Sequence, residues 1–240
     1  MARKPTRKQP VRPQTSSHNN SAQSNHSGSN GDPVVAAFMA LLAERRFEDI
    51  GFAEVARRAG VSLSDVRMKH ASKIEMLAAY MRDVDRVVLD GIDSALADEP
   101  PRERLFDVLM RRLEVLAPHK AAVRSLTRSA MRNPPLAFAL NGLTVQSQQW
   151  MLTAADIGAA GPRGMVRAQG LAVLFASVLR TWVDDDDPGL ARTMAALDRA
   201  LARGQRWSGF LDGALRMASC AGRGRSRRRR RDADDETVAA

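Results

Sequence analysis

The sequence predicts an all-α protein, on the strength of three observations. Apolar residues recur with the 3.6-residue helical period along most of the chain after Asp32. Glycine and proline interrupt these periodic segments, and no segment alternates apolar and polar residues as a half-buried strand does. The interruptions stand at Gly60, Pro100-Pro101, Pro118, Pro134-Pro135, Gly161-Pro162 and Pro188-Gly189. They delimit the expected helices 33–45, 52–59, 63–69, 73–97, 101–117, 119–132, 136–156, 162–183 and 188–217.

The first helix has a clear start signal. Asp32 is a good N-cap, and Pro33 fits the first helical position because its missing N–H has no partner there anyway. The apolar positions that follow with helical spacing are Val34, Phe38, Leu41 and Leu42. The folded part of the chain is therefore expected to begin at Asp32.

The next two helices form a tight pair in the stretch "FAEVARRAGVS", residues 52–62. One face of the first helix carries Val55, Ala56 and Ala59. Ala56 is small where a second helix must cross closely, and Gly60 can adopt the left-handed conformation that reverses the chain. Val61 fills the corner, and Ser62 can cap the following helix together with Asp65 three residues later. This arrangement predicts a helix-turn-helix.

These residues resemble the TetR family of bacterial regulators, whose pattern at this place is V-S-x-G-T-L-Y-x-H-F-x-S-K-E-x-L. The matching positions here are Val61, Ser62, Ser64, Asp65, Val66, Arg67, Lys69, His70, Ser72, Lys73, Ile74 and Met76. The segment 40–62 is also close to the family's first two helices, and the resemblance is specific over residues 34–77. It implies a three-helix DNA-binding head at 32–79 and a helical dimerisation and ligand-binding domain at 80–221. It further implies a homodimeric transcriptional regulator, in the usual case a repressor, that binds a double-stranded DNA operator.

The chain departs from the family pattern within the second helix of the pair. Ser64-Asp65 replaces Gly-Thr, Arg67 replaces Tyr, Lys69 replaces His, and His70 replaces an apolar Phe. A carboxylate at Asp65 would weaken DNA binding unless it serves as a cap, whereas basic side chains can neutralise phosphates. The residues expected to contact DNA are Ser62, Ser64, Arg67, Met68, Lys69 and Lys73. The alternative is a head retained only for packing, whose Arg and Lys side chains simply solvate its surface.

A stripe of small residues marks the helix expected at 162–183. Ala168, Ala172 and Ala176 lie four residues apart, so another helix can approach this face closely. The residues expected at a dimer interface are Ala168, Ala172, Phe175, Ala176 and Leu179. Packing of the stripe within its own subunit is the alternative.

A pocket for a small apolar molecule is the remaining expectation for residues 80–221. Its candidate lining residues are equally well explained as ordinary core. They are Leu109, Leu113, Leu126, Met131, Phe138, Trp150 and Met151.

The formal charge of +10 is concentrated in two tails that are expected to be disordered. Residues 1–31 carry five Lys/Arg and no acids, and residues 222–240 carry seven Arg against four acids. Both tails lack the bulky apolar groups that would compensate the entropy lost on ordering. Little positive charge remains for the folded part, so a high isoelectric point does not by itself indicate DNA binding.

Few residues suggest catalysis or metal binding. The protein is not expected to be an enzyme, to bind a cofactor or to hold a metal ion. Cys220 is the only cysteine, which excludes an internal disulfide framework and argues against a cysteine-based zinc site. Residues 184–187 ("DDDD") could attract a cation, but Asp187 is more simply the cap of a helix that Pro188 begins. The chain also lacks a signal sequence and a clean membrane span, so a cytoplasmic protein is expected.

A second, weaker resemblance supplies the alternative function. Residues 181–207 combine an acidic break with an amphipathic helix and are similar to the ends of TetR-fold accessory proteins of ubiquinone biosynthesis, which bind lipid and do not read DNA. A lipid-binding protein has no need of clustered Arg67, Lys69 and Lys73. Residues 63–70 therefore discriminate between the two functions.

Overall fold

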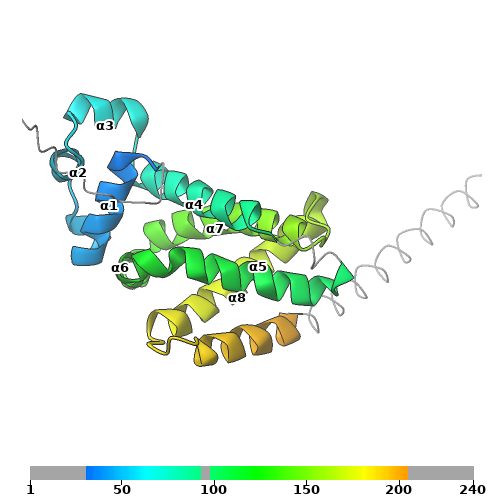
Figure 1. The fold of residues 1–240 in the computed structure, drawn as a ribbon. Coiled ribbons are helices and arrows are strands. Elements are labelled where there is room, and N and C mark those ends of the chain that lie inside the picture. Colours follow the sequence, from blue (N-terminus) through cyan, green and yellow to red (C-terminus); the bar gives the residue numbers. More distant parts are fainter. Residues whose placement is uncertain (1–30, 93–97, 205–240) are drawn as a thin grey trace, which may run out of the picture. The chain divides into compact units, whose positions relative to one another are not determined.

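A computed structural model describes residues 31–92 and 98–204, in which helices predominate and no strand occurs (Figure 1). The predicted all-α fold class is confirmed. The long helices are α1 (Pro33–Glu44), α2 (Phe52–Ala59), α3 (Leu63–Lys69), α4 (Lys73–Asp90), α5 (Pro101–Leu116), α6 (Lys120–Ala130), α7 (Pro134–Ala154) and α8 (Gly161–Val183). Two 3-10 turns, η1 (Phe47–Asp49) and η3 (Ala117–His119), join them, and residues 191–204 are also helical. No helix in these described parts is long and apolar enough to cross a membrane.

Helices α1 and α7 each begin with a polar N-cap residue followed by proline. Asp32 Oδ1 accepts a hydrogen bond from the backbone N–H of Val34 at 2.9 Å, and α1 begins at Pro33. Asn133 caps α7 in the same way, accepting from the N–H of Leu136 at 3.1 Å. Helix α7 therefore begins at Pro134, two residues before the predicted start, because the first turn of a helix tolerates proline.

Two predicted boundaries differ from the structure by three residues or more. The last helix begins at residue 191 and not at 188, because Pro188 and Gly189 form a turn and Asp187 accepts hydrogen bonds from the N–H groups of Gly189 and Ala191. Helix α4 ends at Asp90 and not at 97. The expected tails, apart from residue 31, and the helical stretch expected beyond 204 lie outside the described residues.

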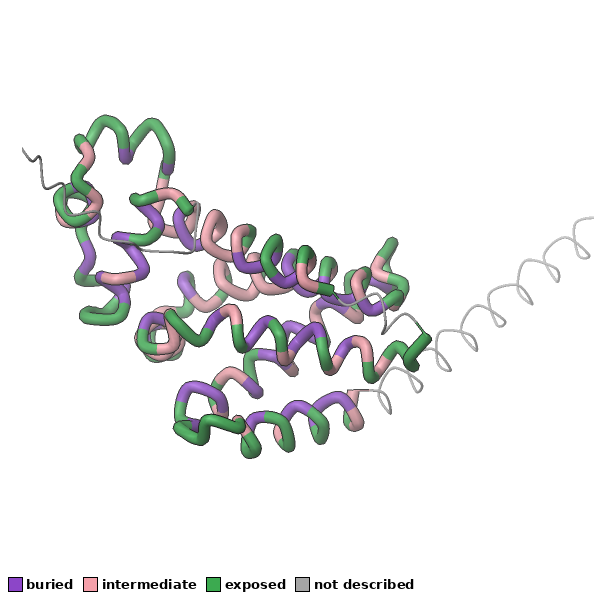
Figure 2. Tube along the Cα trace, viewed as in Figure 1, coloured by how far each residue is buried: buried purple, intermediate pink, exposed green. Residues whose placement is uncertain are grey.

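The buried side chains form two hydrophobic cores that share helix α4 (Figure 2). Met76 and Leu77 of α4 belong to the first core, with the apolar faces of α1, α2 and α3. Val84 and Val88 belong to the second core, with α5, α7, α8 and the helical residues 191–204. Tyr80 packs against both cores. The boundary expected between residues 79 and 80 thus falls inside a continuous helix.

Helix α6 attaches the first three helices to the rest of the chain. The backbone N–H of Phe47 donates to Ser129 Oγ at 3.2 Å, and Ser125 Oγ donates to the carbonyl of Arg45 at 2.7 Å. Ala122 of α6 is fully buried in the first core, beside α1. A shift of α6 would therefore act directly on the segment between α1 and α2.

Candidate functional site

A glycine makes the turn of the helix-turn-helix. Gly60 has φ +69°, and its N–H points to the carbonyls of Ala56 and Arg57. No atom lies within 4 Å of the position that a Cβ at residue 60 would occupy. The left-handed backbone, and not lack of space, is therefore what requires glycine here.

Helix α3 begins with the predicted capping box. Ser62 Oγ accepts from the N–H of Asp65 at 3.1 Å, and Asp65 Oδ2 accepts from the Ser62 N–H at 3.2 Å. The Ser62 hydroxyl also donates to Asp65 Oδ2 at 2.6 Å. These hydrogen bonds, the hydroxyl one first, hold the pKa of Asp65 below its ordinary value. The carboxylate that departs from the TetR-like pattern is thus engaged at the start of its own helix.

Helix α3 buries one residue, Val66, and exposes the others. Figure 2 shows this helix as mostly exposed. At 100° per residue, Ser64 and Met68 lie on the side of the helix opposite Val66, and Arg67 lies on one flank. Met68 is 85% exposed, the largest fraction of any large apolar side chain in the described parts. The outward face of α3 is therefore free to meet another molecule.

A buried histidine ties the end of α3 to the start of α1. His70 Nε2 lies 3.0 Å from Asp32 Oδ2, and Lys69 Nζ lies 3.5 Å from Asp32 Oδ1. Burial by itself would raise the pKa of Asp32, but hydrogen bonds from Val34 N–H and His70 and the charge of Lys69 bring it below its ordinary value. His70 occupies a position where the resemblance implies an apolar residue, and the Asp32 carboxylate is the hydrogen-bond partner of its ring Nε2.

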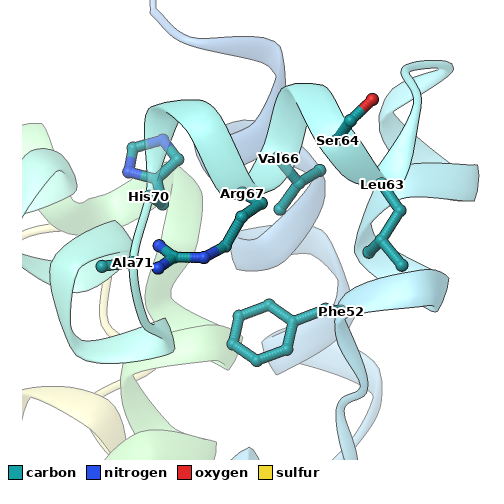
Figure 3. Close-up of a pocket in the computed structure, with 7 residues that line it drawn as sticks. All are labelled: Phe52, Leu63, Ser64, Val66, Arg67, His70 and Ala71. Carbon is teal, nitrogen blue, oxygen red and sulfur yellow. The ribbon is translucent and has the colours of Figure 1, made fainter.

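A groove of about 620 Å³ runs beside α3 (Figure 3). The groove is lined by Phe52, Leu63, Ser64, Val66, Arg67, His70 and Ala71. Figure 3 shows the Arg67 side chain leaving α3 on the side of Phe52. Arg67 forms no hydrogen bond or ion pair with any described residue. Its guanidinium is therefore available to an external anion.

Lys73 is engaged inside the protein. Its Nζ donates to the backbone carbonyls of Phe47 at 2.7 Å and Ile50 at 3.1 Å, and it lies 4.4 Å from the centroid of the Phe47 ring. Burial lowers the pKa of this half-buried amine. Lys73 was expected to contact DNA, and its ammonium is here engaged by the loop between α1 and α2.

The folded head carries no net charge. Between residues 32 and 79 the sequence holds seven basic and seven acidic side chains. Several of the basic groups are paired, including Arg58 with Glu44 at 2.6 Å and Arg45 with Glu54 at 3.0 Å. Any electrostatic attraction of the head to an anion must therefore be local.

The comparisons with solved structures agree on one fold. A TetR transcriptional regulator from Nitrosomonas europaea superimposes with a TM-score of 0.57 at 21% identity, covering 72% of this chain and 97% of that one. A TetR regulator from Rhodococcus sp. RHA1 gives 0.51 at 21% identity, covering 72% and 93%. A putative TetR-family regulator from Syntrophomonas wolfei gives 0.52 at 12% identity, covering 73% and 93%. The chain has the TetR fold. No family model and no curated protein matches the sequence.

Within this TetR fold, the small-residue stripe of α8 faces its own subunit. Ala168, Ala172 and Phe175 are at most 2% exposed, and Ala168 and Phe175 belong to the second core. Leu179 is half-buried against the same core, and only Ala176 is exposed. Most of the residues expected at the interface therefore pack within their own subunit, as the alternative described. Small residues four apart allow close helix packing in either setting.

The other side of α8 and the adjoining side of α7 expose apolar side chains, here called the α7–α8 outer face. Its members are Phe138 on α7 and Met165, Val166, Val173 and Ala176 on α8. Phe138 is 81% exposed. Reciprocal hydrogen bonds of 3.1 and 3.0 Å between the Asn141 and Gln169 side chains join the two helices beside this face. Clustered exposed apolar groups of this kind mark interaction surfaces.

Polar side chains also lie buried in the second core. Arg112 of α5 forms an ion pair with Asp85 of α4, and Ser147 Oγ of α7 donates to Asp85 Oδ1 at 2.6 Å. The Arg112 guanidinium also lies 5.6 Å from the centroid of the Phe175 ring. A sequence signal existed, because Arg112 shares a helical face with the buried Leu105, Leu109 and Leu116.

Several buried polar atoms on α4, α5, η3 and α7 hydrogen-bond to no described residue. They are Gln148 Oε1 and Nε2, Arg112 Nε, the Tyr80 hydroxyl and His119 Nδ1. The rings of Tyr80 and His119 meet edge to face at 5.2 Å between centroids. Burial raises the pKa of Tyr80 and lowers that of His119, so both are neutral near pH 7. We call Tyr80, Arg112, His119 and Gln148 the buried polar cluster.

The apolar pocket residues expected from the sequence divide between core and surface. Leu109, Leu113 and Met151 are fully buried, whereas Met131 and Trp150 are exposed. Phe138 belongs to the outer face, and Leu126 is partly buried against the first core. The expected pocket residues are thus spread over both cores and the surface.

The acidic loop after α8 is held by hydrogen bonds. Asp185 Oδ2 accepts from the N–H and the hydroxyl of Thr193, at 2.9 and 2.6 Å. These bonds, the hydroxyl one first, keep the pKa of Asp185 below its ordinary value. In the described part of the chain, no group of His, Cys, Asp or Glu is placed to hold a metal ion.

Proposed function

We propose that the protein is a DNA-binding transcriptional regulator that reads its operator with α3. The observation that carries this proposal is the outward face of α3, which a glycine turn and a capping box position and which leaves Ser64, Arg67 and Met68 exposed. Ser62 and Lys69 lie at the two ends of α3. In the proposed complex they would contact the phosphates on either side of the bases that α3 reads. Lys73 is left out of the contact set because its ammonium binds backbone carbonyls. Because the head has no net charge, we expect it to contact a few phosphates through single side chains and not through a broad basic patch.

A homodimer is the second part of the proposal. The α7–α8 outer face offers a second copy of the chain an apolar surface, and burying Phe138 and Val173 would remove two largely exposed side chains from water. A symmetric pair of such faces is self-complementary, which is the commonest arrangement of soluble oligomers. Two heads related by a two-fold axis would bind a near-palindromic operator with half-sites about one helical turn apart.

Ligand control is the third part, with the buried polar cluster as the effector site. Buried polar atoms without partners are costly, so a small, largely apolar molecule carrying a hydrogen-bonding group would satisfy Gln148 and Arg112 and gain affinity. Helix α4 carries Tyr80 and Asp85 and continues into the first core, and α6 follows directly on His119. A ligand at the cluster would therefore act on both connections to the head. The simplest role for such a dimer is repression, by occupying DNA until the ligand binds.

The lipid-binding alternative finds less support. It requires the helix within residues 181–207 to present its apolar face to lipid, but Thr193, Leu197, Ala200 and Leu201 of this helix are buried in the subunit. A catalytic role is not proposed either, because the polar groups described above are explained by capping, by internal ion pairs or by the effector site.

The test is a fluorescence anisotropy titration of the full-length protein with two labelled duplexes. One duplex carries the DNA upstream of the protein's own gene, and the other is a random sequence of equal length. A regulator of its own promoter binds the upstream duplex at least tenfold more tightly at physiological salt. Equal affinity for both duplexes, together with no enrichment when the same protein selects from a random duplex library, would refute DNA reading.

A further inference from the structure

The side chains at the centre of the outward face of α3 are unusual for a reader of base edges. Sequence-specific helices commonly present Arg or Lys to guanine, or Asn or Gln to adenine. Here the two central positions are Ser64 and Met68, and neither is a guanidinium, an ammonium or a carboxamide. Ser64 Oγ lies 2.7 Å from Ser62 Oγ, so part of its hydrogen-bonding capacity is used within the capping box.

The neighbouring polar side chains on α3 are less suited to the base edges. The Asp65 carboxylate is bonded to Ser62, and Lys69 is drawn toward Asp32. Arg67 leaves the helix on the groove side, toward Phe52, as Figure 3 shows. In the proposed complex, the Arg67 guanidinium would contact a phosphate at the edge of the major groove. The Met68 side chain would contact the base edges on the floor of that groove.

We propose that Met68 reads thymine, through van der Waals contact between its thioether side chain and the C5-methyl group in the major groove. This inference rests on the proposed function. The thymine methyl is the one apolar feature that a base pair displays in the major groove, and an unbranched apolar side chain can cover it. Met68 is 85% exposed in the free protein, so contact with a methyl would remove more apolar surface from water than any other α3 residue could.

The inference makes a definite statement about the operator. Each half-site should contain at least one thymine whose methyl group contributes to affinity. The contribution of Arg67 should not depend on sequence, because phosphate contacts position a protein without specifying bases.

The experiment uses deoxyuridine, which differs from thymidine only by lacking that methyl group. Full-length protein first selects its preferred duplex from a random library. Each thymine in the selected sequence is then replaced by deoxyuridine, in both half-sites together, and the affinity is measured by anisotropy. We expect one position, or two adjacent positions, to weaken binding by about tenfold, since two methyl contacts are lost per dimer at roughly three- to fourfold each.

Variants at residue 68 assign the effect. Met68→Ala should bind the thymine duplex about as weakly as the wild type binds the deoxyuridine duplex, and it should no longer distinguish the two. Met68→Leu is the matched control and should retain the distinction. Because the side chain is exposed, neither substitution should change the melting temperature.

Three outcomes separate this inference from the proposed function. A selected sequence whose deoxyuridine forms all bind like the thymine form refutes the role of Met68 and leaves DNA reading intact. A deoxyuridine effect that persists in Met68→Ala assigns the methyl contact to another residue and also refutes the inference. Failure to select any sequence refutes the proposed function, and the inference with it.

Discussion

Lys73 shows how one side chain can be satisfied inside the fold although its position suggests DNA contact. Its ammonium joins the carbonyls of Phe47 and Ile50, 26 and 23 residues away in the sequence. We expect Lys73→Ala to lower the free energy of unfolding by about 1–2 kcal/mol, because two carbonyls lose a charged donor at a half-buried site. Urea denaturation followed by circular dichroism measures this.

Lys69→Ala is the control for Lys73, since Lys69 is exposed and its single ion pair at 3.5 Å contributes little to stability. If Lys73→Ala unfolds at the same urea concentration as the wild type and only weakens DNA binding, the structural role given to Lys73 is wrong.

Gly60 provides a purely conformational test. A Cβ at this position would meet no atom within 4 Å, so Gly60→Ala should cost only the left-handed backbone, roughly 1–2 kcal/mol. Gly60→Asn should cost less, because asparagine tolerates this conformation better. Equal losses for both substitutions in urea denaturation would point to a steric cause and contradict this explanation.

The residues that the sequence predicted well are those whose partners are close in the chain. The turn at Gly60 and the box of Ser62 and Asp65 follow from local backbone geometry and needed no tertiary information. The bond between His70 and Asp32 spans 38 residues, and the burial of His70 depends on how α3 meets α1. Such long-range partners cannot be read from spacing.

At the level of helices, the buried ion pair between Asp85 and Arg112 joins α4 to α5. Asp85→Ala should destabilise the fold by about 3–5 kcal/mol, because it leaves the Arg112 guanidinium buried without its partner. Adding Arg112→Met to that variant should restore much of the loss by removing the unpaired charge. A double variant that melts no higher than Asp85→Ala alone would show that the pair does not act as a unit.

The two sides of α8 predict opposite outcomes for adjacent residues. Val173→Glu places a charge on the α7–α8 outer face and should convert a dimer into a folded monomer in light scattering, with an unchanged helical spectrum. Ala172→Glu places the same charge in the core, where the residue is 2% exposed, and should cause loss of folded protein instead. A Val173→Glu variant that remains dimeric would place the interface elsewhere.

Periodicity predicted the helices well but not which face of each helix meets which neighbour. The alanine stripe of α8 correctly marks a surface of close helix packing, yet nothing in its spacing distinguishes a neighbour in the same subunit from one in another. The buried polar cluster was missed for a related reason. Arg112 lies on an apolar helical face, but its partner Asp85 is 27 residues away, and Ser147, which donates to Asp85, is 62 residues from that carboxylate.

At the scale of the whole molecule, the proposed DNA binding would combine charged terminal segments with a folded head. The head is neutral over residues 32–79, and most of the excess positive charge belongs to residues 1–31 and 222–240. Under the proposed function, sequence-independent attraction would come chiefly from those segments, whereas α3 would read the sequence. The fold class was predictable because helix periodicity and breaks extend over the whole described chain.

The most direct test of the central claim, that the exposed face of α3 contacts DNA, is the salt dependence of operator affinity for Arg67→Ala. Affinity is measured by anisotropy between about 50 and 200 mM salt, with Arg199→Ala, an exposed arginine on the helix at residues 191–204, as the control. We expect Arg67→Ala to weaken binding to operator and random duplex alike and to reduce the slope of log K against log salt by about two, one phosphate contact per subunit of a dimer. Arg199→Ala should leave both unchanged. A slope for Arg67→Ala equal to that of the wild type would contradict the assignment of α3 as the DNA-binding surface.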